Sequence, residues 1–292
     1  MDEIKVGNRM VAITHPERIL FGKSGITKGE LIEYYRKIAP IMLEFIKDHP
    51  LTLQRFPEGI THEGFYQKDA SDYFPAWIKR KAVAKKDDGN VHYVVASNTP
   101  TLVYLANQAC IVMHAWPSRI DKLAYPDRII FDLDPSIRDF SLVRKAALDL
   151  KNHLENVGIT SFVMTTGSKG LHVVAPIIRK YTNDFVVAWA QELAQKMIAR
   201  HPDRYTLELR KDKRGDRIFI DTLRNSWGAT SVAPYSVRAR EGAPVATPIF
   251  WKEVESSSLA SDKYTIRNLE RHLAKGNPWK EFALVKNKLS DW

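Results

Sequence analysis

The stretch Ile129-Ile130-Phe131-Asp132-Leu133-Asp134-Pro135 indicates the fold more clearly than any other part of the chain. Its apolar residues predict a strand over residues 128–133, and Pro135 ends it. Side chains alternate between the two faces of a strand, so Asp132 and Asp134 share the face opposite the apolar residues. Two carboxylates on one face can share divalent cations, and Mg²⁺ and Mn²⁺ prefer oxygen ligands. The alternative is a solvated strand end, where acidic residues are common.

A second apolar strand, Arg217-Ile218-Phe219-Ile220-Asp221, also ends in a carboxylate. Three carboxylates at the ends of strands can hold two metal ions. Phosphoryl transfer uses such a pair, because one ion lowers the pKa of the attacking 3′ hydroxyl and the other neutralises the leaving pyrophosphate. We therefore predict that Asp132, Asp134 and Asp221 form a catalytic centre with ions roughly 4 Å apart.

Between these strands lies Thr165-Thr166-Gly167-Ser168-Lys169-Gly170-Leu171-His172, in which two glycines flank a Ser-Lys pair. Glycine lets backbone N–H groups turn toward an anion, Lys169 adds a positive charge, and His172 begins the next strand as a donor. The segment lacks the spacing of a Walker loop. A phosphate-binding loop and an ordinary tight turn both fit it.

Arginines follow the third carboxylate. Arg224 comes three residues after Asp221, and the segment 235–240 carries Arg238 and Arg240. We expect this segment to be extended, which would place its two arginines on one face. Guanidinium groups match phosphate geometry better than ammonium groups do. A solvated basic edge strand is the alternative.

The order of elements predicts a largely antiparallel sheet with helices on it. In the second half the expected order is βαββαβ, with short links between strands at 166–172 and 210–217. Its expected helices are 141–157 and 183–200, and its expected strands are 128–133, 162–166, 172–176 and 217–221. The first half predicts a helix over 27–48, capped by Thr27 with Glu30 three residues later, and Pro40 should break or kink it. A strand over 92–96, a helix over 99–110 and a tail helix over 264–273 complete the set.

The composition allows a nucleic-acid partner without requiring one. The 44 Lys and Arg residues exceed the 34 Asp and Glu residues, which gives a formal net charge of +10 and a pI near 9.5. Such a charge fits a polyanion partner and also a merely basic surface. The single cysteine, Cys110, excludes an internal disulfide and suits a reducing cytoplasm. No apolar run approaches the roughly 18 residues of a membrane span, and the first residues do not form a secretory signal.

Several blocks in the same order make the chain resemble the polymerase domain of ligase D, a member of the archaeo-eukaryotic primase superfamily. The resemblance runs nearly from end to end. The matching blocks are Thr14-His15-Pro16-Glu17-Arg18, Thr27-Lys28, His114-Ala115-Trp116, Phe131-Asp132-Leu133-Asp134-Pro135, Gly167-Ser168-Lys169-Gly170-Leu171-His172, Asp221-Thr222-Leu223-Arg224-Asn225 and Ala233-Pro234-Tyr235-Ser236-Val237-Arg238-Ala239-Arg240.

The resemblance implies an α+β primase-polymerase fold. Its RRM-like palm would have a mostly antiparallel central sheet flanked by helices, with an N-terminal α/β module packed on it. The chain would form a single domain over 1–292. Its parts would be a DNA-end-binding module over 1–115, a catalytic palm over 116–260 and a helical tail over 261–292.

The resemblance also implies roles for individual residues. Asp132, Asp134 and Asp221 match the family's catalytic metal ligands. The residues implied to bind the nucleotide are His114, Thr166, Ser168, Lys169, His172, Arg224, Arg238 and Arg240. The residues implied to bind the downstream 5′ phosphate are His15, Arg18 and Lys28, and those implied to meet the template are Phe65, Tyr66 and Lys68. Tyr66 departs from the family's usual pair of Phe, and Thr166 replaces a frequent Ser. Taken alone, His15 and Arg18 would be read as solvated loop residues, and the aromatic pair as part of the core.

The function implied is a template-directed, gap-filling and end-extending polymerase of non-homologous end joining. It would add NTPs or dNTPs to a DNA 3′ hydroxyl with Mn²⁺ or Mg²⁺, often preferring ribonucleotides, in the cytoplasm at the nucleoid. Its partners would be broken or gapped DNA, the end-binding protein Ku and a DNA ligase, with no membrane. The alternatives are a primase that starts chains, a non-catalytic DNA-end-bridging module, and a metal-dependent nuclease.

Overall fold

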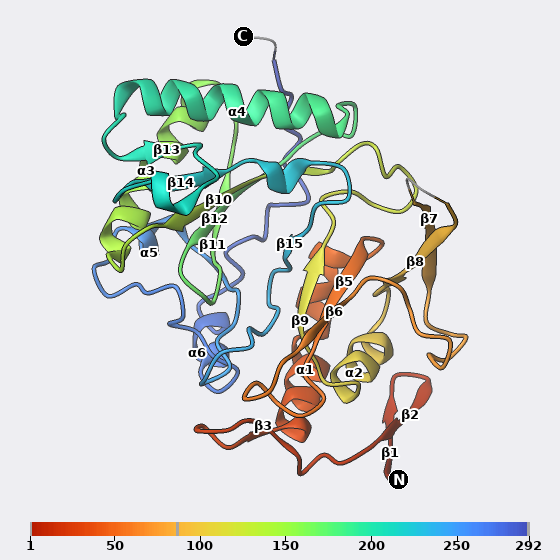
Figure 1. Cartoon of the computed structure of the whole chain (residues 1–292). Helices are drawn as coiled ribbons and strands as arrows, with labels where there is room; N and C mark the ends of the chain where they lie inside the picture. The colour runs from red at the N-terminus through yellow and green to blue at the C-terminus, as the bar shows by residue number, and fades with distance from the viewer. Residues whose placement is uncertain (1, 86–87, 291–292) are drawn as a thin grey trace. The chain divides into compact units, whose positions relative to one another are not determined.

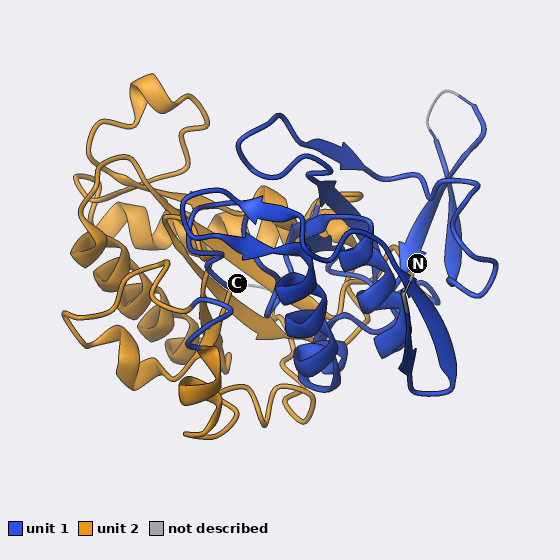
Figure 2. Cartoon of the chain, turned by 90° about the horizontal axis from the view of Figure 1, so that it is seen from below, with its two compact units in different colours: residues 1–121, 230–245, 265–268 blue, residues 122–229, 246–264, 269–292 orange. Residues whose placement is uncertain are grey.

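The computed structural model describes residues 2–85 and 88–290 (Figure 1). The chain divides into two compact units, which Figure 2 shows in different colours. Unit 1 comprises residues 1–121, 230–245 and 265–268, and unit 2 comprises residues 122–229, 246–264 and 269–292. Each unit is therefore built from segments that are distant in the sequence.

Unit 1 contains a sheet of order β15-β9-β5-β8-β7, with β6 paired to β5. The strands are β5 (Pro50–Arg55), β6 (Phe65–Gln67), β7 (Arg80–Ala84), β8 (Asn90–Val95), β9 (Cys110–Ala115) and β15 (Ser231–Val232). Two hairpins precede it, β1 (Asp2–Val6) with β2 (Arg9–Ile13) and β3 (Ile19–Phe21) with β4 (Ile26–Thr27). The helices of this unit are α1 (Lys28–Ile46) and α2 (Thr99–Asn107), which pack on each other.

The start of α1 agrees with the predicted capping box. The Thr27 hydroxyl accepts a hydrogen bond from the Glu30 N–H at 3.2 Å, and the Glu30 carboxylate accepts one from the Thr27 N–H at 3.0 Å. Of the two outcomes expected at Pro40, a break or a kink, the break is wrong, because α1 continues through it to Ile46. A proline inside a helix costs about 3 kcal/mol. Burial of Met42 and Phe45 beyond it contributes roughly 1.5–3 kcal/mol each, which offsets that cost.

Unit 2 is built on a sheet of order β13-β14-β10-β12-β11-β16. Its strands are β10 (Arg128–Pro135), β11 (Phe162–Thr165), β12 (Leu171–Pro176), β13 (Tyr205–Thr206), β14 (Ile218–Asp221) and β16 (Pro248–Ile249). With α3 (Phe140–Asn156) and α4 (Asn183–Arg200), the order β10-α3-β11-β12-α4-β13-β14 contains the predicted βαββαβ order, with the short strand β13 added between α4 and β14. Helix α3 packs on β10 and β12, and α4 packs on β10 and β13.

The sheet of unit 2 is mostly antiparallel, as predicted, with one exception. Strand β13 pairs with β14 in parallel. The link over 210–217 is therefore no antiparallel hairpin, and it contains the 3₁₀ turn η1 (Lys211–Lys213). A second 3₁₀ turn, η2 (Leu223–Asn225), follows β14.

Apart from residues 265–268, which belong to unit 1, the C-terminal tail is part of the packed structure of unit 2. The short helix α5 (Trp251–Val254) precedes the tail, and the helix within the tail is α6 (Leu269–Leu273), so the expected tail helix begins later than residue 264. Trp279 is fully buried, stacks on Phe282, and donates from its indole N–H to the Val163 carbonyl at 3.0 Å. Within the described residues, no helix has both the length and the apolar character needed to cross a membrane.

Candidate active site

Strand register brings three polar side chains of unit 2 into one row. Asp132 on β10 lies opposite Asp221 on β14 and opposite His172 on β12. Side chains of directly opposed residues in antiparallel strands point to the same face and are neighbours. Asp134 lies two residues along β10, on the same face. The structure therefore places all three predicted carboxylates on one side of two adjacent strands.

Cationic groups already contact these carboxylates. Arg224 Nε lies 3.1 Å from Asp132 Oδ2 and 3.1 Å from Asp221 Oδ2, so the two oxygens are no farther apart than twice that distance. His172 Nε2 lies 3.5 Å from Asp132 Oδ1, and Arg214 Nη1 lies 3.7 Å from Asp134 Oδ2. The Asp132 and Asp221 side chains are only 14% and 15% exposed, which makes this pairing necessary to hold charge there.

The pKa values of the three carboxyls differ because their surroundings differ. Burial opposes ionisation of Asp132, but His172 and Arg224 outweigh it and lower its pKa to about 2. Burial, together with the charge of Asp132, raises the pKa of Asp134 against the opposing cations. Burial raises the pKa of Asp221, and Asp132 adds to this against the effect of Arg224. Asp132 is therefore firmly ionised, whereas burial and the nearby negative charge of Asp132 make ionisation of Asp134 and Asp221 less favourable.

The donor chemistry fits hard divalent cations, although the side chains are turned toward other partners. In residues 2–85 and 88–290, no three His, Cys, Asp or Glu side chains are arranged to hold a metal ion. In the predicted site, the Arg224 guanidinium is shared by Asp132 and Asp221, and Arg214 lies beside Asp134. Three carboxylates on neighbouring strands nevertheless supply the oxygen ligands that Mg²⁺ and Mn²⁺ prefer.

The glycine-rich loop over residues 166–170 leaves β11 and enters β12 beside this row. Thr166 is buried and its hydroxyl accepts from the backbone N–H groups of Ser168 and Gly170, at 3.3 and 3.1 Å. Ser168 is half-buried and Lys169 is exposed. A Cβ atom on Gly170 would lie 2.2 Å from the Leu133 carbonyl oxygen, so only glycine allows this approach to β10. The loop is thus seated against the strand that carries Asp132 and Asp134.

Three residues predicted to bind the nucleotide lie in unit 1. His114 is on β9, opposite Thr52 and Val232. The expectation that Arg238 and Arg240 share a face of an extended segment is wrong, because the Arg240 N–H donates to the Arg238 carbonyl at 2.8 Å in a tight turn.

Packing within unit 1 imposes this turn. Tyr235 has a positive φ of 66°, and the Ser236 hydroxyl accepts from the Met113 N–H at 2.8 Å. The Ser236 contact anchors the residues before Arg238 to β9. The segment is therefore not a continuous strand, in which side chains two residues apart would point to the same face.

Lys28, predicted to bind the 5′ phosphate, is only 5% exposed. Its Nζ donates to the Thr14 hydroxyl at 3.1 Å. Burial lowers the pKa of Lys28, repulsion from Arg18 lowers it further, and Glu17 opposes both. The Thr14 N–H in turn donates to Asn107 Oδ1 at 3.0 Å. Asn107 therefore orients the Lys28 partner, a role that no sequence signal indicated.

The other two residues of this group lie in the preceding loop. His15 is exposed and has a positive φ of 46°. Arg18 Nη1 donates to the Pro57 carbonyl at 2.7 Å and to Glu58 at 3.0 Å. The first N–H groups of α1 donate to the Arg18 and Pro16 carbonyls, each at 2.8 Å. Any phosphate bound here would therefore meet side chains and not the free amides of a helix start.

Phe65 and Tyr66 on β6 are 46% and 63% exposed, so the alternative that they belong to the core is wrong. The buried Arg55 guanidinium lies 5.4 Å from the Phe65 ring centre and donates to the Tyr73 hydroxyl at 2.7 Å. Lys68 beside them is exposed. Exposed aromatic rings such as these, of which Phe65 packs against the Arg55 guanidinium, are suited to stacking on bases.

Comparison with known proteins decides the family. The sequence model of the LigD primase-polymerase domain matches residues 27–279. The chain belongs to the LigD primase-polymerase family. It is accordingly a nucleotidyltransferase, and membership of a polymerase family implies divalent metal ions.

Two curated relatives and one solved structure show the extent of the likeness. The multifunctional non-homologous end joining protein LigD of Pseudomonas aeruginosa is 33% identical over 96% of this chain and 34% of its own length. The bifunctional LigD of Bacillus subtilis is 32% identical over 92% of this chain and 43% of its own length. The polymerase domain of Mycobacterium tuberculosis ligase D in complex with DNA has a TM-score of 0.89 at 27% identity, over 95% of this chain and 99% of that one. The chain thus spans well under half the length of these curated relatives.

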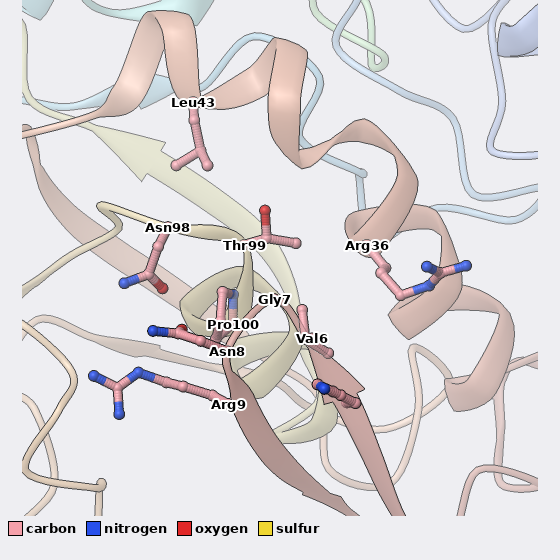
Figure 3. A pocket seen from close by; sticks show the side chains of 10 residues that line it. Val6, Gly7, Asn8, Arg9, Arg36, Leu43, Asn98, Thr99 and Pro100 are labelled. Carbon is pink, nitrogen blue, oxygen red and sulfur yellow. The ribbon is translucent and has the colours of Figure 1, made fainter.

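Unit 1 also contains a pocket whose lining includes none of the predicted site residues. It has a volume of about 530 Å³ and is lined in unit 1 by the β1–β2 turn, by Arg36 and Leu43 of α1, and by the start of α2 (Figure 3). Arg36 is paired with Glu33 at 2.7 Å, and Arg9 lies over the Trp77 ring.

Proposed function

We propose that this LigD-type polymerase fills gaps and extends ends in non-homologous end joining. It would add NTPs or dNTPs to a DNA 3′ hydroxyl under direction of a template, and would recognise a downstream 5′ phosphate. The observation that carries the proposal is the row of Asp221, Asp132 and His172 across β14, β10 and β12, with Asp134 beside it.

Asp132, Asp134 and Asp221 would hold two divalent cations, Mn²⁺ or Mg²⁺. Such ions lower the pKa of the attacking hydroxyl and offset the charge of the leaving pyrophosphate. Ser168, Lys169 and His172 would orient the triphosphate, with Thr166 acting inside the loop. Positioning and electrostatics then supply most of the rate enhancement.

Arg224 has two roles in this proposal. Without cations, its guanidinium neutralises Asp132 and Asp221, as its raised pKa reflects: burial opposes the charge, and the two carboxylates outweigh it. When cations take over the carboxylates, the guanidinium would turn to phosphate oxygens. His114, Arg238 and Arg240 would be further contacts of the nucleotide.

Unit 1 would hold the DNA. Lys28, Arg18 and His15 would bind the 5′ phosphate, which carries more charge than an internal phosphate. Phe65 and Tyr66 would stack on template bases, with Lys68 contacting the backbone. Ku and a DNA ligase are the expected partners, and the nucleoid in the cytoplasm is the expected location.

Primer extension on a duplex with a short gap tests the proposal. Ribo- and deoxynucleotides are compared with Mg²⁺ and Mn²⁺, on gaps with and without a 5′ phosphate. The proposal predicts incorporation that is stronger with the phosphate. Dinucleotide synthesis on an unprimed template would indicate a primase, and degradation of labelled DNA without nucleotides would indicate a nuclease. Joining of ends without incorporation, with any metal, would indicate a bridging module.

A further inference from the structure

The glycine-rich loop over residues 166–170 is held by a residue almost a hundred positions later in the chain. We propose that Ser261, in the tail segment after α5, is a positioning residue that fixes this loop for the triphosphate of the incoming nucleotide. The inference rests on the proposed function and adds a residue to the same site.

Ser261 contacts the loop through its side chain and its backbone. Its hydroxyl donates to the Gly170 carbonyl at 2.9 Å and lies 3.1 Å from the Thr166 hydroxyl. Its carbonyl accepts from the Gly167 N–H at 3.0 Å. Ser261 is buried, as are the three loop residues that it contacts. One residue therefore reaches both ends of the loop through its side chain and the turn of the loop through its backbone.

The hydrogen bonds of these residues form one buried network. The Gly170 carbonyl has two lone pairs and accepts from the Thr166 N–H, at 3.1 Å, and from the Ser261 hydroxyl. The Thr166 hydroxyl accepts from the N–H groups of Ser168 and Gly170, and its proton has two acceptors within reach, the Gly170 carbonyl at 3.0 Å and Ser261 Oγ at 3.1 Å. Removing the Ser261 hydroxyl takes a donor from the Gly170 carbonyl and one of two acceptors from the Thr166 proton in a buried place, which is costly.

The hydrogen bonds of Ser261 to Thr166, Gly167 and Gly170, called the clamp below, also fix the distance from the loop to the carboxylates. Gly170 lies so close to the Leu133 carbonyl that no side chain fits there. Leu133 stands between Asp132 and Asp134 on β10. On the other side, Thr165 exchanges backbone hydrogen bonds with Thr247, at 2.9 and 3.1 Å. With both flanks fixed, Ser261 determines whether the exposed tip at Lys169 keeps one position relative to the carboxylates.

Ser261→Ala tests the inference, because it should weaken binding of the nucleoside triphosphate and leave binding of DNA unchanged. We expect KM for the nucleoside triphosphate to rise about tenfold, as loss of about one buried hydrogen bond implies. The Kd for a non-hydrolysable triphosphate analogue should rise in parallel. The Kd for gapped DNA should stay within twofold of that of the unaltered chain.

Tyr264→Phe is the matched control. The Tyr264 hydroxyl, three residues after Ser261, bonds to Glu253 of α5 and not to the loop. This variant loosens the tail without touching the clamp, so its KM for the triphosphate should stay unchanged. An equal rise of KM in both variants would show that tail stability alone is responsible, and would overturn the inference.

A double-mutant cycle with Thr166→Val supplies a second measurement. Because the two hydroxyls share one network, the effects of Ser261→Ala and Thr166→Val on triphosphate Kd should be less than additive. Additive effects of the two substitutions would overturn the inference that Ser261 fixes the loop through Thr166. Unchanged triphosphate binding in Ser261→Ala, with the unaltered chain active, would refute the inference and leave the proposed function intact. An unaltered chain that incorporates no nucleotide would refute the proposed function itself.

Discussion

The carboxylate row of unit 2 and the Lys28 pocket of unit 1 handle buried charge in opposite ways. In the row, Asp132 and Asp221 are paired with Arg224, and Asp132 also meets His172. In the pocket, Lys28 Nζ donates to the neutral hydroxyl of Thr14, and burial lowers its pKa. The row thus holds its anions with basic side chains, which metal ions would replace in the proposed function, whereas the predicted phosphate site at Lys28 holds a cation that an incoming anion would stabilise.

The largest effect is expected from Asp221→Ala. Loss of one ligand from a two-metal centre removes several kcal/mol of transition-state stabilisation, so single-turnover incorporation should fall about a thousandfold or more. Binding of gapped DNA should persist. Asp216→Ala, an exposed carboxylate just before β14, is the control and should leave the rate unchanged. Incorporation near the original rate by the Asp221 variant would show that the row is not the reaction centre.

Gly170→Ala should have the next largest effect. The new Cβ would meet the Leu133 carbonyl at 2.2 Å, so the loop must move away from β10. A displacement of about 1 Å costs on the order of a hundredfold in rate. Gly158→Ala replaces a glycine of unit 2 that has a positive φ of 74° but lies in open space, and it should lower only the Tm. Equal rates for the two variants would contradict the seating of the loop.

The aromatic pair should matter for single-stranded template. Stacking contributes about 1–3 kcal/mol per base, so Phe65→Ala with Tyr66→Ala should raise the Kd for a duplex with a single-stranded overhang at least tenfold. The Kd for blunt duplex should change much less. Met10→Ala, which removes another exposed apolar side chain of unit 1, should affect neither Kd. The stacking role fails if both DNAs lose affinity equally.

The smallest effect, and the sharpest test of the pocket, concerns Lys28. A protonated lysine binds the phosphate, and the folded chain lowers the pKa of this lysine below the usual 10.5. The preference for a 5′-phosphorylated gap should therefore be full at lower pH and decline as the pH rises through that lowered pKa. Lys28→Met should lose most of the preference, severalfold in Kd, and its remaining preference should not vary with pH in that range.

Lys23→Met, at an exposed position in the turn between β3 and β4, is the comparison for Lys28. It should keep both the preference and its pH dependence. A preference that survives in the Lys28 variant would show that the 5′ phosphate binds elsewhere.

The sequence predicted most elements of unit 2 because its information there is local. Alternation in β10 and the length of each apolar run identified β10, β11, β12 and β14, and the short links ordered them as βαββαβ, whereas the two-residue strands β13 and β16 are too short to give a pattern. Register between strands is not local, so the direct pairing of Asp132 with Asp221 needed the structure. The turn at Arg238 escaped prediction for a related reason: the residues before it are held by partners distant in the sequence, the Tyr235 carbonyl by Tyr34 of α1 and the Ser236 hydroxyl by Met113 of β9.

The supporting residues could not be predicted. Ser261 and Asn107 act through hydrogen bonds to residues about ninety positions away, and a single serine or asparagine carries no pattern. Pro40 shows the converse case, in which a strong local signal for breaking a helix is overruled by burial of the residues that follow it.

The number of Mn²⁺ ions bound by the chain, measured by electron paramagnetic resonance during titration, tests the central claim most directly. With a non-hydrolysable nucleoside triphosphate present, the account predicts two ions per chain for the unaltered protein and weakened binding of at least one in Asp132→Ala. Equal binding of two ions by the Asp132→Ala variant would contradict the claim that Asp132, Asp134 and Asp221 hold the metals.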